Sequence, residues 1–387
     1  MVLHLLRADS SLRNRIAVVD ESGEWLTGWQ GQFARLGISV LRSPGVHHPG
    51  PDVHALSDFV ADRRMLRSGL PYDLPRAEAF EGFCRHLIED ADLAAPIACR
   101  AIDSERVGRS ILLRTTGPDI LATRVVVASN PHKRVIPDWV WGVLGQGCTG
   151  IAHADDVDLR QLSDLRGESI TVVGGGLSAG HLACGAAQRG AHVRLVSRRP
   201  LQVRPFDTDP GWLGPKNLAD YSATDDPLLR LRQARAARGG GTMPQWMHDR
   251  IQDAVAAGVI SLHESDVTSA TPHDGRCRLA LANDTTMETD RLWLATGTCP
   301  DLSAIRFLDP LLPDVVEVDG YPLTDANLRV GAHPIHVMGR LATLTLGPAA
   351  GNLWGARHAA RRITQAITGV DLDALTIRAG KTRNKST

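Results

Sequence analysis

A glycine-rich turn between an apolar run and a helix-length segment is the part of this sequence whose residue types and spacing point most clearly to chemistry. Gly174, Gly176 and Ala179 form a G-x-G-x-x-A pattern directly after the apolar residues 170–173. The first glycine allows a tight turn, the second lets backbone amides approach a phosphate, and the alanine lets the helix pack closely on a sheet. Free amides and the dipole at a helix N-terminus favour negative charge. The pattern therefore predicts a site for the pyrophosphate of a dinucleotide.

Two arginines after the next predicted strand indicate which of the two nicotinamide dinucleotides binds. A predicted strand, 192–196, completes a strand–helix–strand unit, and Ser197-Arg198-Arg199 follows it. About 20 residues after the first glycine, NAD sites usually carry an acidic residue for the ribose, whereas NADP sites carry cations. Guanidinium groups pair well with a phosphate. The sequence therefore favours NADPH over NADH, and a solvated basic turn is the alternative interpretation of the arginine pair.

The same turn also matches the nucleophile motif of serine hydrolases. Residues 176–180 read G-x-S-x-G between a strand and a helix, so Ser178 is a candidate nucleophile. Its partners would be Asp301 and one of His333, His336 or His358. This interpretation leaves Gly174 and the arginine pair unexplained. We therefore place Ser178 among the cofactor-binding residues and keep a serine hydrolase, and a non-catalytic NADPH-binding module, as alternatives.

The elements that must position this turn alternate between short β-branched runs and helix-length segments. Such alternation is typical of an α/β fold with a parallel sheet. The predicted strands are Ile16–Val19, Arg124–Ala128, Ile170–Val173, His192–Val196, Arg291–Ala295 and Ile335–Met338. The predicted helices are Ala179–Arg189, Pro244–Ala257 and Ala349–Ile367.

The composition is that of an ordinary globular protein. The 387 residues suggest two domains, at roughly 100–200 residues per domain. With 43 basic and 43 acidic residues the net charge is zero, which argues against a nucleic acid or an anionic membrane as a partner. The apolar runs are strand-sized, and the first residues lack the features of a secretory signal. We therefore expect a cytoplasmic protein that acts on a small-molecule substrate and binds neither nucleic acid nor a membrane.

The cysteines and histidines show no spacing typical of a redox pair or a metal site. The six cysteines lie far apart, without a C-x-x-C pair, and the 15 histidines include no H-E-x-x-H motif. We expect reduced thiols and no metal.

The beginning of the chain resembles the second strand of another dinucleotide-binding unit. The run 16–19 ends in Asp20, the acid that would bind a ribose, followed by Glu24-Trp25. In such a unit the glycines lie about 20 residues before the acid, which falls ahead of residue 1. Either the sequence given starts late, or a cofactor is held without these glycines.

In order, these features are similar to those of flavoproteins with two dinucleotide sites, in particular the flavin-containing and N-hydroxylating monooxygenases. The segments that carry the resemblance are Asp20 with Glu24-Trp25, 125–131, Gly174 to Ala179, Leu294-Ala295-Thr296-Gly297, 337–339 and 346–352. Asn130 departs from the family, which has a glycine in the first of its two Ala-Thr-Gly crossings.

The resemblance implies two Rossmann-like three-layer domains, with an NADPH domain (152–298) inserted in a discontinuous FAD domain (1–151 and 299–387). It implies that NADPH reduces FAD and that the reduced flavin uses molecular oxygen to oxidise a nitrogen, a sulfur or a carbonyl compound. Whether the chain forms a homo-oligomer is left open. Besides the turn and the arginine pair, the implied cofactor-binding residues are Asp20, Trp25, Thr296, Gly297, Gly339, Gly347, Pro348 and Ala349.

No residue is singled out as catalytic, but one loop contains three weak candidates. Arg42, His47 and His48 follow the first strand unit and would approach the flavin ring in this layout. Histidine titrates near neutral pH, and arginine suits anions. A surface loop bounded by prolines is an equally good interpretation.

Overall fold

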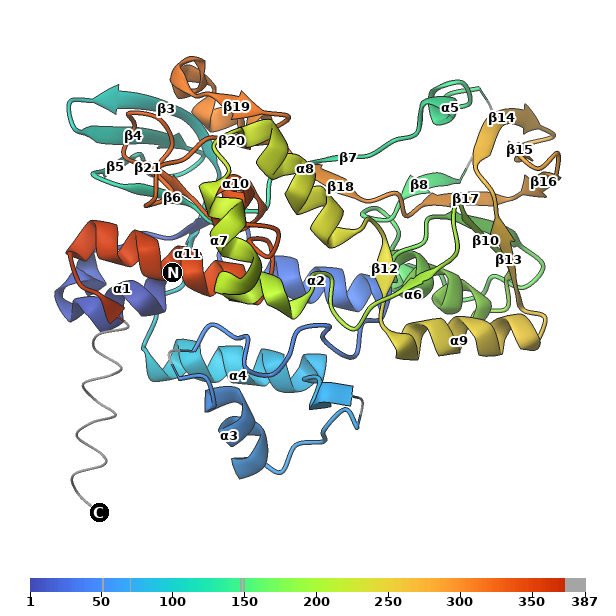
Figure 1. Cartoon of the computed structure of the whole chain (residues 1–387), viewed down its shortest axis with the longest axis horizontal. Helices are drawn as coiled ribbons and strands as arrows, with labels where there is room; N and C mark the ends of the chain where they lie inside the picture. The colour runs from blue at the N-terminus through green and yellow to red at the C-terminus, as the bar shows by residue number, and fades with distance from the viewer. Residues whose placement is uncertain (51, 70, 147, 149, 373–387) are drawn as a thin grey trace.

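The apolar run before the glycines forms the centre of a five-stranded parallel sheet. The computed structural model describes residues 1–372 apart from 51, 70, 147 and 149. The strands in spatial order are β13 (Ile260–Glu264), β10 (His192–Ser197), β9 (Ser169–Val173), β17 (Arg291–Leu294) and β8 (Ile151–His153). β-Branched side chains suit strands covered on both faces, and Ile170 and Val172 are fully buried. This sheet is the core of the right-hand half of the molecule in Figure 1.

Helices cover one face of this sheet, and an antiparallel meander covers the other. The helices are α6 (Leu177–Ala187) and α9 (Gln245–Ala256). Small residues let them approach closely, because a Cβ at Gly180 would lie 2.7 Å from Cγ of Met247. The opposite face is covered by β14 (Val267–His273), β15 (Arg276–Leu281), β16 (Thr286–Thr289) and α5 (Asp138–Trp141). Successive side chains of β10 point to opposite faces of the sheet. Leu195 packs in the core beneath the helices, and Val196 packs in the core beneath the meander.

The left-hand half carries its parallel strands in two separate pairs. The pairs are β1 (Val19–Asp20) with β2 (Ile97–Ala98), and β6 (Val125–Val127) with β21 (Ile335–Val337). A second meander contains β3 (Ala101–Val107), β4 (Ser110–Thr115) and β5 (Ile120–Ala122). The helices of this half are α1 (Val2–Ala8), α3 (Ala55–Asp62), α4 (Ala77–Asp90), α10 (Thr343–Leu346) and α11 (Leu353–Thr368). The helix α2 (Thr27–Leu36) lies in the middle of Figure 1 and contacts α6, and its Leu36 enters the core of the five-stranded sheet.

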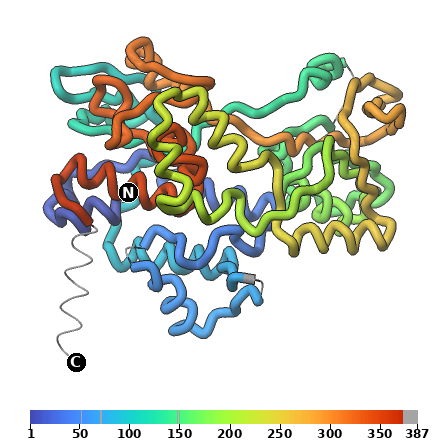
Figure 2. The backbone as a smooth tube through the Cα atoms, in the orientation of Figure 1, coloured from blue at the N-terminus to red at the C-terminus, as the bar shows by residue number. Residues whose placement is uncertain are grey.

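Two extended crossings and one helical excursion connect the halves (Figure 2). The crossings are β7 (His132–Arg134) and β18 (Thr298–Pro300), which pair antiparallel. The excursion runs from β11 (Gln202–Val203) through α7 (Pro215–Ala223) and α8 (Pro227–Arg238) to β12 (Thr242–Met243). A final short hairpin contains β19 (Glu317–Val318) and β20 (Tyr321–Pro322). Helix α8 of the excursion packs against α10 of the left-hand half. The two halves are therefore joined by packed helices as well as by the two crossings.

The predicted elements are present, with shifted ends. The helix expected at 349–367 begins only at Leu353, because the side chain of Asn352 caps it by accepting from the amide of Gly355. The strand expected at 16–19 is wrong in its extent, since β1 contains only Val19 and Asp20 and follows a 3-10 turn. Among the described residues, no helix has the length and apolar character needed to cross a bilayer.

Candidate functional site

Gly174 turns the chain at the end of β9 in a position that only glycine can occupy. Its φ angle is +149°, and its amide donates to the carbonyl of Val196 at 2.9 Å. A Cβ here would lie 2.4 Å from the carbonyl oxygen of Ala295, which belongs to the backbone and cannot rotate away. The turn is therefore held between the ends of β10 and β17, at the carboxyl edge of the sheet where α/β proteins bind ligands.

Gly176 begins α6 and leaves the first turn of the helix open to an anion. No side chain caps this end of α6, so its first amides keep their hydrogen-bonding capacity. Ser178 is exposed in this turn, whereas Ala179 is fully buried against the sheet. A Cβ at Gly176 would lie 3.2 Å from Cα of Gly241. The segment 239–241, a run of three glycines that sequence analysis did not connect with this site, therefore lies directly against the phosphate-binding turn.

The two predicted arginines have different environments. Arg198 is exposed at the end of β10, where a ribose phosphate could meet it. Arg199 is half-buried and donates a hydrogen bond to the carbonyl of Gly239. Arg198 is thus the freer partner for a 2′-phosphate, whereas Arg199 fastens the glycine run beside the turn.

The structure does not support the serine hydrolase interpretation, because no hydrogen bond of the described residues joins Ser178 to Asp301, His333 or His336. Ser178 lies on α6 in the right-hand half, while its proposed partners belong to other elements. The carboxylate of Asp301 caps a short turn by accepting from the amide of Ser303, and Nδ1 of His336 contacts the carbonyl of Asn327. The other two histidines lie before β21 and on α11. The described residues do not assemble a Ser-His-Asp triad.

In the left-hand half, Asp20 ends β1 with an exposed carboxylate. Its Oδ1 accepts from both the amide and the hydroxyl of Ser22, which orients the group. The indole Nε1 of Trp25 donates to the carbonyl of Ala94 at 3.1 Å. Asp20 can therefore still accept from a ribose hydroxyl, whereas the polar edge of Trp25 is already used.

Two glycines near the second crossing present open backbone. Gly297 and Gly339 have φ angles of +84° and +65°, and a Cβ at either would meet nothing within 4 Å. Thr296, beside them, donates its hydroxyl to the carbonyl of Val135. These two glycines leave space that a planar ring or a ribityl chain could fill.

The turn at 347–349 is instead covered by the excursion. A Cβ at Gly347 would lie 2.7 Å from Leu218, and the carbonyl of Pro348 accepts from Arg238 at 3.1 Å. Ala349 is fully buried. In this arrangement the turn contacts α7 and α8 and not open surface.

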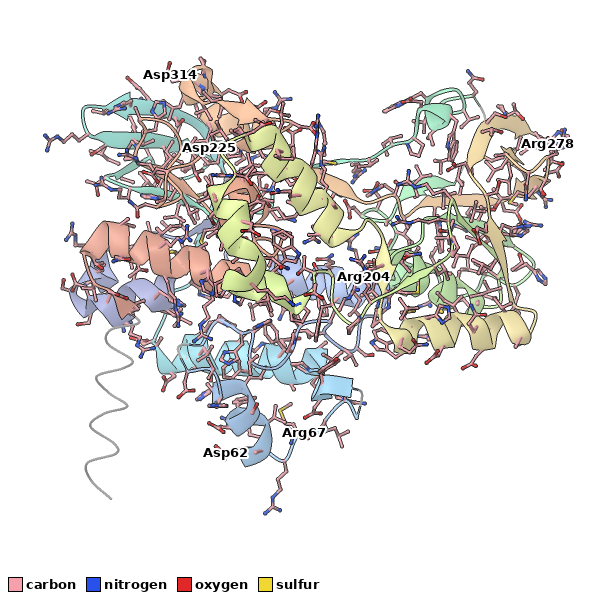
Figure 3. All side chains as sticks on the ribbon, viewed as in Figure 1. Asp62, Arg67, Arg204, Asp225, Arg278 and Asp314 are labelled. Atoms are coloured by element: carbon pink, nitrogen blue, oxygen red, sulfur yellow. The ribbon has the colours of Figure 1, made fainter. Side chains whose placement is uncertain are left out.

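A row of arginines that we call the basic seam runs between the halves; its members are Arg42, Arg204, Arg238 and Arg340. Arg42 donates to the carbonyls of Arg204 and Thr242 and to the hydroxyl of Thr242, at 2.8 to 3.0 Å. Figure 3 labels Arg204 near the centre of the molecule, between the two halves. Burial lowers the pKa of Arg42 to about 10, with Asp207 opposing the shift.

The charge of the basic seam is only partly balanced by the protein. Arg340 is bonded to the hydroxyl and carbonyl of Thr298, and burial lowers its pKa as well. Arg238 pairs with Asp207 at 3.0 Å. A buried cation whose partners are neutral oxygens is costly, and an anionic ligand would lower that cost. The seam is therefore the strongest electrostatic indication of an anionic ligand between the halves.

The two histidines of the candidate loop also differ. His48 is buried, contacts the amide of Gly50 and the carbonyl of Val53, and packs edge-on against Phe83. Its role in the structure is to shape the loop. The pKa of His47 is lowered by burial and by Arg357, which keeps the ring neutral near pH 7. His47 therefore remains able to accept a proton.

A charged cluster that no sequence pattern predicted lies where the crossings meet the sheet. The carboxylate of Asp155 lies 3.4 Å from Nδ1 of His153 and 3.3 Å from Nε2 of His132. These contacts, the one with His153 first, lower the pKa of Asp155 to about 2. Arg134 pairs with Asp156 at 2.6 Å through both carboxylate oxygens. The cluster fixes the crossings to the right-hand half, and no local sequence pattern announces it.

Known proteins resemble this chain in part of its sequence and in nearly all of its fold. Residues 90–211 match the family model described as pyridine nucleotide-disulphide oxidoreductase. The FAD-bound cadaverine monooxygenase DfoA of the desferrioxamine pathway, from Erwinia amylovora, is similar with a TM-score of 0.71 and 16% identity, over 96% of this chain and 92% of that one. No curated protein matches.

Two further solved structures give the same result. The ornithine N-hydroxylase KtzI from Kutzneria sp. 744, with reduced FAD, NADP⁺ and L-ornithine, has a TM-score of 0.70 and 16% identity, over 95% of this chain and 96% of that one. A flavin monooxygenase variant from Stenotrophomonas maltophilia has a TM-score of 0.61 and 19% identity, over 94% and 95%. The chain thus has the α/β fold of these flavin enzymes, as the resemblance implied.

Proposed function

We propose that this protein is an NADPH-dependent flavoprotein monooxygenase that oxidises a nitrogen, a sulfur or a carbonyl group of a small molecule. The observation that carries the proposal is the basic seam, which joins a complete phosphate-binding turn to a half with the fold of flavin enzymes. DfoA is bound to FAD, and KtzI to reduced FAD and NADP⁺. In the proposed division, residues 152–298 bind NADPH, and 1–151 with 299–387 bind FAD.

NADPH fits the residues of the right-hand half. The open amides after Gly176 and the exposed hydroxyl of Ser178 would hold the pyrophosphate, and Gly174 and Ala179 shape the turn beneath it. Arg198 would bind the 2′-phosphate. Because Arg199 is bonded to Gly239, we assign it the task of holding the glycine run over the bound phosphates.

FAD fits the left-hand half at its ribose and ring ends. Asp20 would accept from the ribose, while Gly297 and Gly339 leave open backbone for the rest of the cofactor. When bound, FAD supplies the transfer of electrons from NADPH to oxygen. Trp25 and Thr296 are held by hydrogen bonds to the carbonyls of Ala94 and Val135, and we assign them and the turn 347–349 to the walls of this site.

The chain's own residues bind and orient, and few of them are placed to move protons. Arg42 and Arg340 bring fixed positive charge to the seam, where phosphates of either cofactor would neutralise it. Covering the turn with residues 239–241 would exclude water from the phosphates. His47, neutral near pH 7, is our candidate for accepting a proton from a substrate.

The test is the visible spectrum of the full chain after incubation with FAD, followed by NADPH under nitrogen and then by air. We expect a flavin spectrum that NADPH bleaches and oxygen restores. Cadaverine and L-ornithine are the first substrate probes, because DfoA is a cadaverine monooxygenase and KtzI an ornithine N-hydroxylase. A chain that binds NADPH but never FAD would contradict the proposal and favour a non-catalytic NADPH-binding module.

The same assay separates redox chemistry from hydrolysis. Ser178→Ala should leave flavin reduction largely intact, since the serine hydroxyl supplements several backbone amides. Loss of an esterase activity in this variant, with no flavin reduction in the parent protein, would overturn the assignment.

A further inference from the structure

Four arginines line most of a cleft on the left-hand half. Its volume is about 280 Å³, and its lining residues are Arg106, Arg109, Arg124, Arg329, Ala332 and Pro334. The arginines come from β3, from the turn after it, from the link between β5 and β6, and from the segment before β21. None of these residues belongs to the cofactor site described above, and this cleft is distinct from the basic seam.

The protein supplies little negative charge to this cleft. Arg329 pairs with Asp325 at 3.3 Å. Arg106 donates to the carbonyls of Gly108 and Ala332, each at 3.2 Å, and Arg124 donates to the carbonyl of Thr123. Among the described residues, Arg109 has no hydrogen-bond or ion-pair partner. Within the part of the chain that the structure describes, three of the four guanidinium groups thus pair with no carboxylate, although the net charge of the chain is zero.

The positive charge of the cleft also acts on the neighbouring core. His336 on β21 is buried, and its pKa is lowered first by burial and then by Arg124 and Arg329, against the opposing effects of Asn327 and Asp325. The guanidinium groups of Arg124 and Arg329 come from separate segments of the chain, and both lie close enough to His336 to lower its pKa. Convergence of like charges from separate segments is unfavourable unless an anion offsets it.

The arginines are also partly oriented before any ligand arrives. Arg106 is held by two backbone carbonyls, and each guanidinium carries five N–H donors, so donors remain for a ligand. Phosphate groups suit this arrangement because their oxygens accept paired, charge-assisted hydrogen bonds from arginine. The volume lies just below the usual ~300–1,000 Å³ of small-molecule pockets, which favours a compact ligand. We propose that this cleft binds a small anion carrying two adjacent phosphate groups.

The experiment is a calorimetric titration of the full chain with inorganic pyrophosphate. Saturating NADP⁺ keeps the phosphate turn occupied, and sodium chloride holds the ionic strength constant. We expect the double variant Arg109→Gln/Arg124→Gln to bind pyrophosphate at least about 10-fold more weakly, the effect of losing about 1.4 kcal/mol of charge-assisted bonding. The matched control, Arg15→Gln/Arg232→Gln, removes two other exposed arginines and should bind as the parent does.

A second arm replaces pyrophosphate with ADP to identify the source of the diphosphate. Tighter binding of ADP, lost in the cleft variant, would support a nucleotide ligand, and equal binding would support free pyrophosphate. No binding by the parent beyond the chloride control, or equal binding by the parent and the cleft variant, would overturn the proposal. All four arginines are exposed, so thermal unfolding should be unchanged. If the double variant unfolds early, the single variant Arg109→Gln decides, because Arg109 bonds to no other residue that the structure describes, and pyrophosphate binding equal to that of the parent would then overturn the proposal.

Discussion

The two halves of the molecule hold their cofactor-binding segments in different ways. In the right-hand half, the phosphate-binding turn ends the central strand of a continuous five-stranded sheet. In the left-hand half, the parallel strands form the separate pairs β1–β2 and β6–β21. A turn held between two neighbouring strands cannot relax, whereas a turn at the end of an isolated pair has room to move. Equivalent substitutions should therefore have unequal effects in the two halves.

The largest difference is expected between two glycines with positive φ. Gly174→Ala places a Cβ 2.4 Å from the backbone of Ala295, so we expect unfolding free energy to fall by about 3 kcal/mol or more. Gly339→Ala, where nothing lies within 4 Å, should lose only about 1 kcal/mol. Urea denaturation of both variants measures the difference. Equal losses would contradict the distinction between the halves.

A smaller loss is expected from breaking the basic seam. Arg42→Gln removes hydrogen bonds to the half-buried carbonyls of Thr242 and Arg204, at a cost of about 2 to 3 kcal/mol. The matched control is Arg13→Gln, because Arg13 also donates to two carbonyls but is exposed, and it should change stability by less than about 0.5 kcal/mol. Thermal unfolding of both variants measures the difference. If the unfolding transition of Arg42→Gln is not shifted from that of the parent protein, the basic seam does not stabilise the contact between the halves.

Arg198→Gln should change coenzyme preference and leave stability unchanged, because Arg198 is exposed. We expect the KM for NADPH to rise about 10-fold with the KM for NADH unaffected, as a single charge-assisted contact to the 2′-phosphate is lost. Arg232→Gln, an exposed arginine on α8, serves as the control. If preference for NADPH survives intact, Arg198 is not the phosphate partner.

The smallest effect concerns the cluster at the crossings. Contacts with His153 and His132 hold the pKa of Asp155 at about 2, below its ordinary value of 3.8. The stability it contributes is therefore present above pH 3.8 and is lost as the pH falls toward 2. Asp155→Asn should flatten this part of the curve of unfolding free energy against pH. An unchanged curve would show that Asp155 is not coupled to folding.

Sequence patterns predicted the site best where its parts are close along the chain. Local residue types set the strand, the turn after it and the following helix. The strand was expected at 170–173 and lies at 169–173, and the helix was expected from Ala179 and begins at Leu177. Arg42 was expected near a flavin, but its partners are about 160 to 200 residues away and belong to the other half. Nothing local indicates that the glycines 239–241 lie against Gly176.

The sequence alone determined the α/β fold, the phosphate-binding turn and its basic neighbours, because periodicity, β-branched runs and glycine placement act over a few residues. Only the tertiary structure decided that one arginine stays free while the next fastens a distant glycine run, and that four others converge on a cleft. The reason is that charge, burial and hydrogen bonding depend on the distances between atoms after folding. Side chains on separate elements acquire those distances only when the elements pack together.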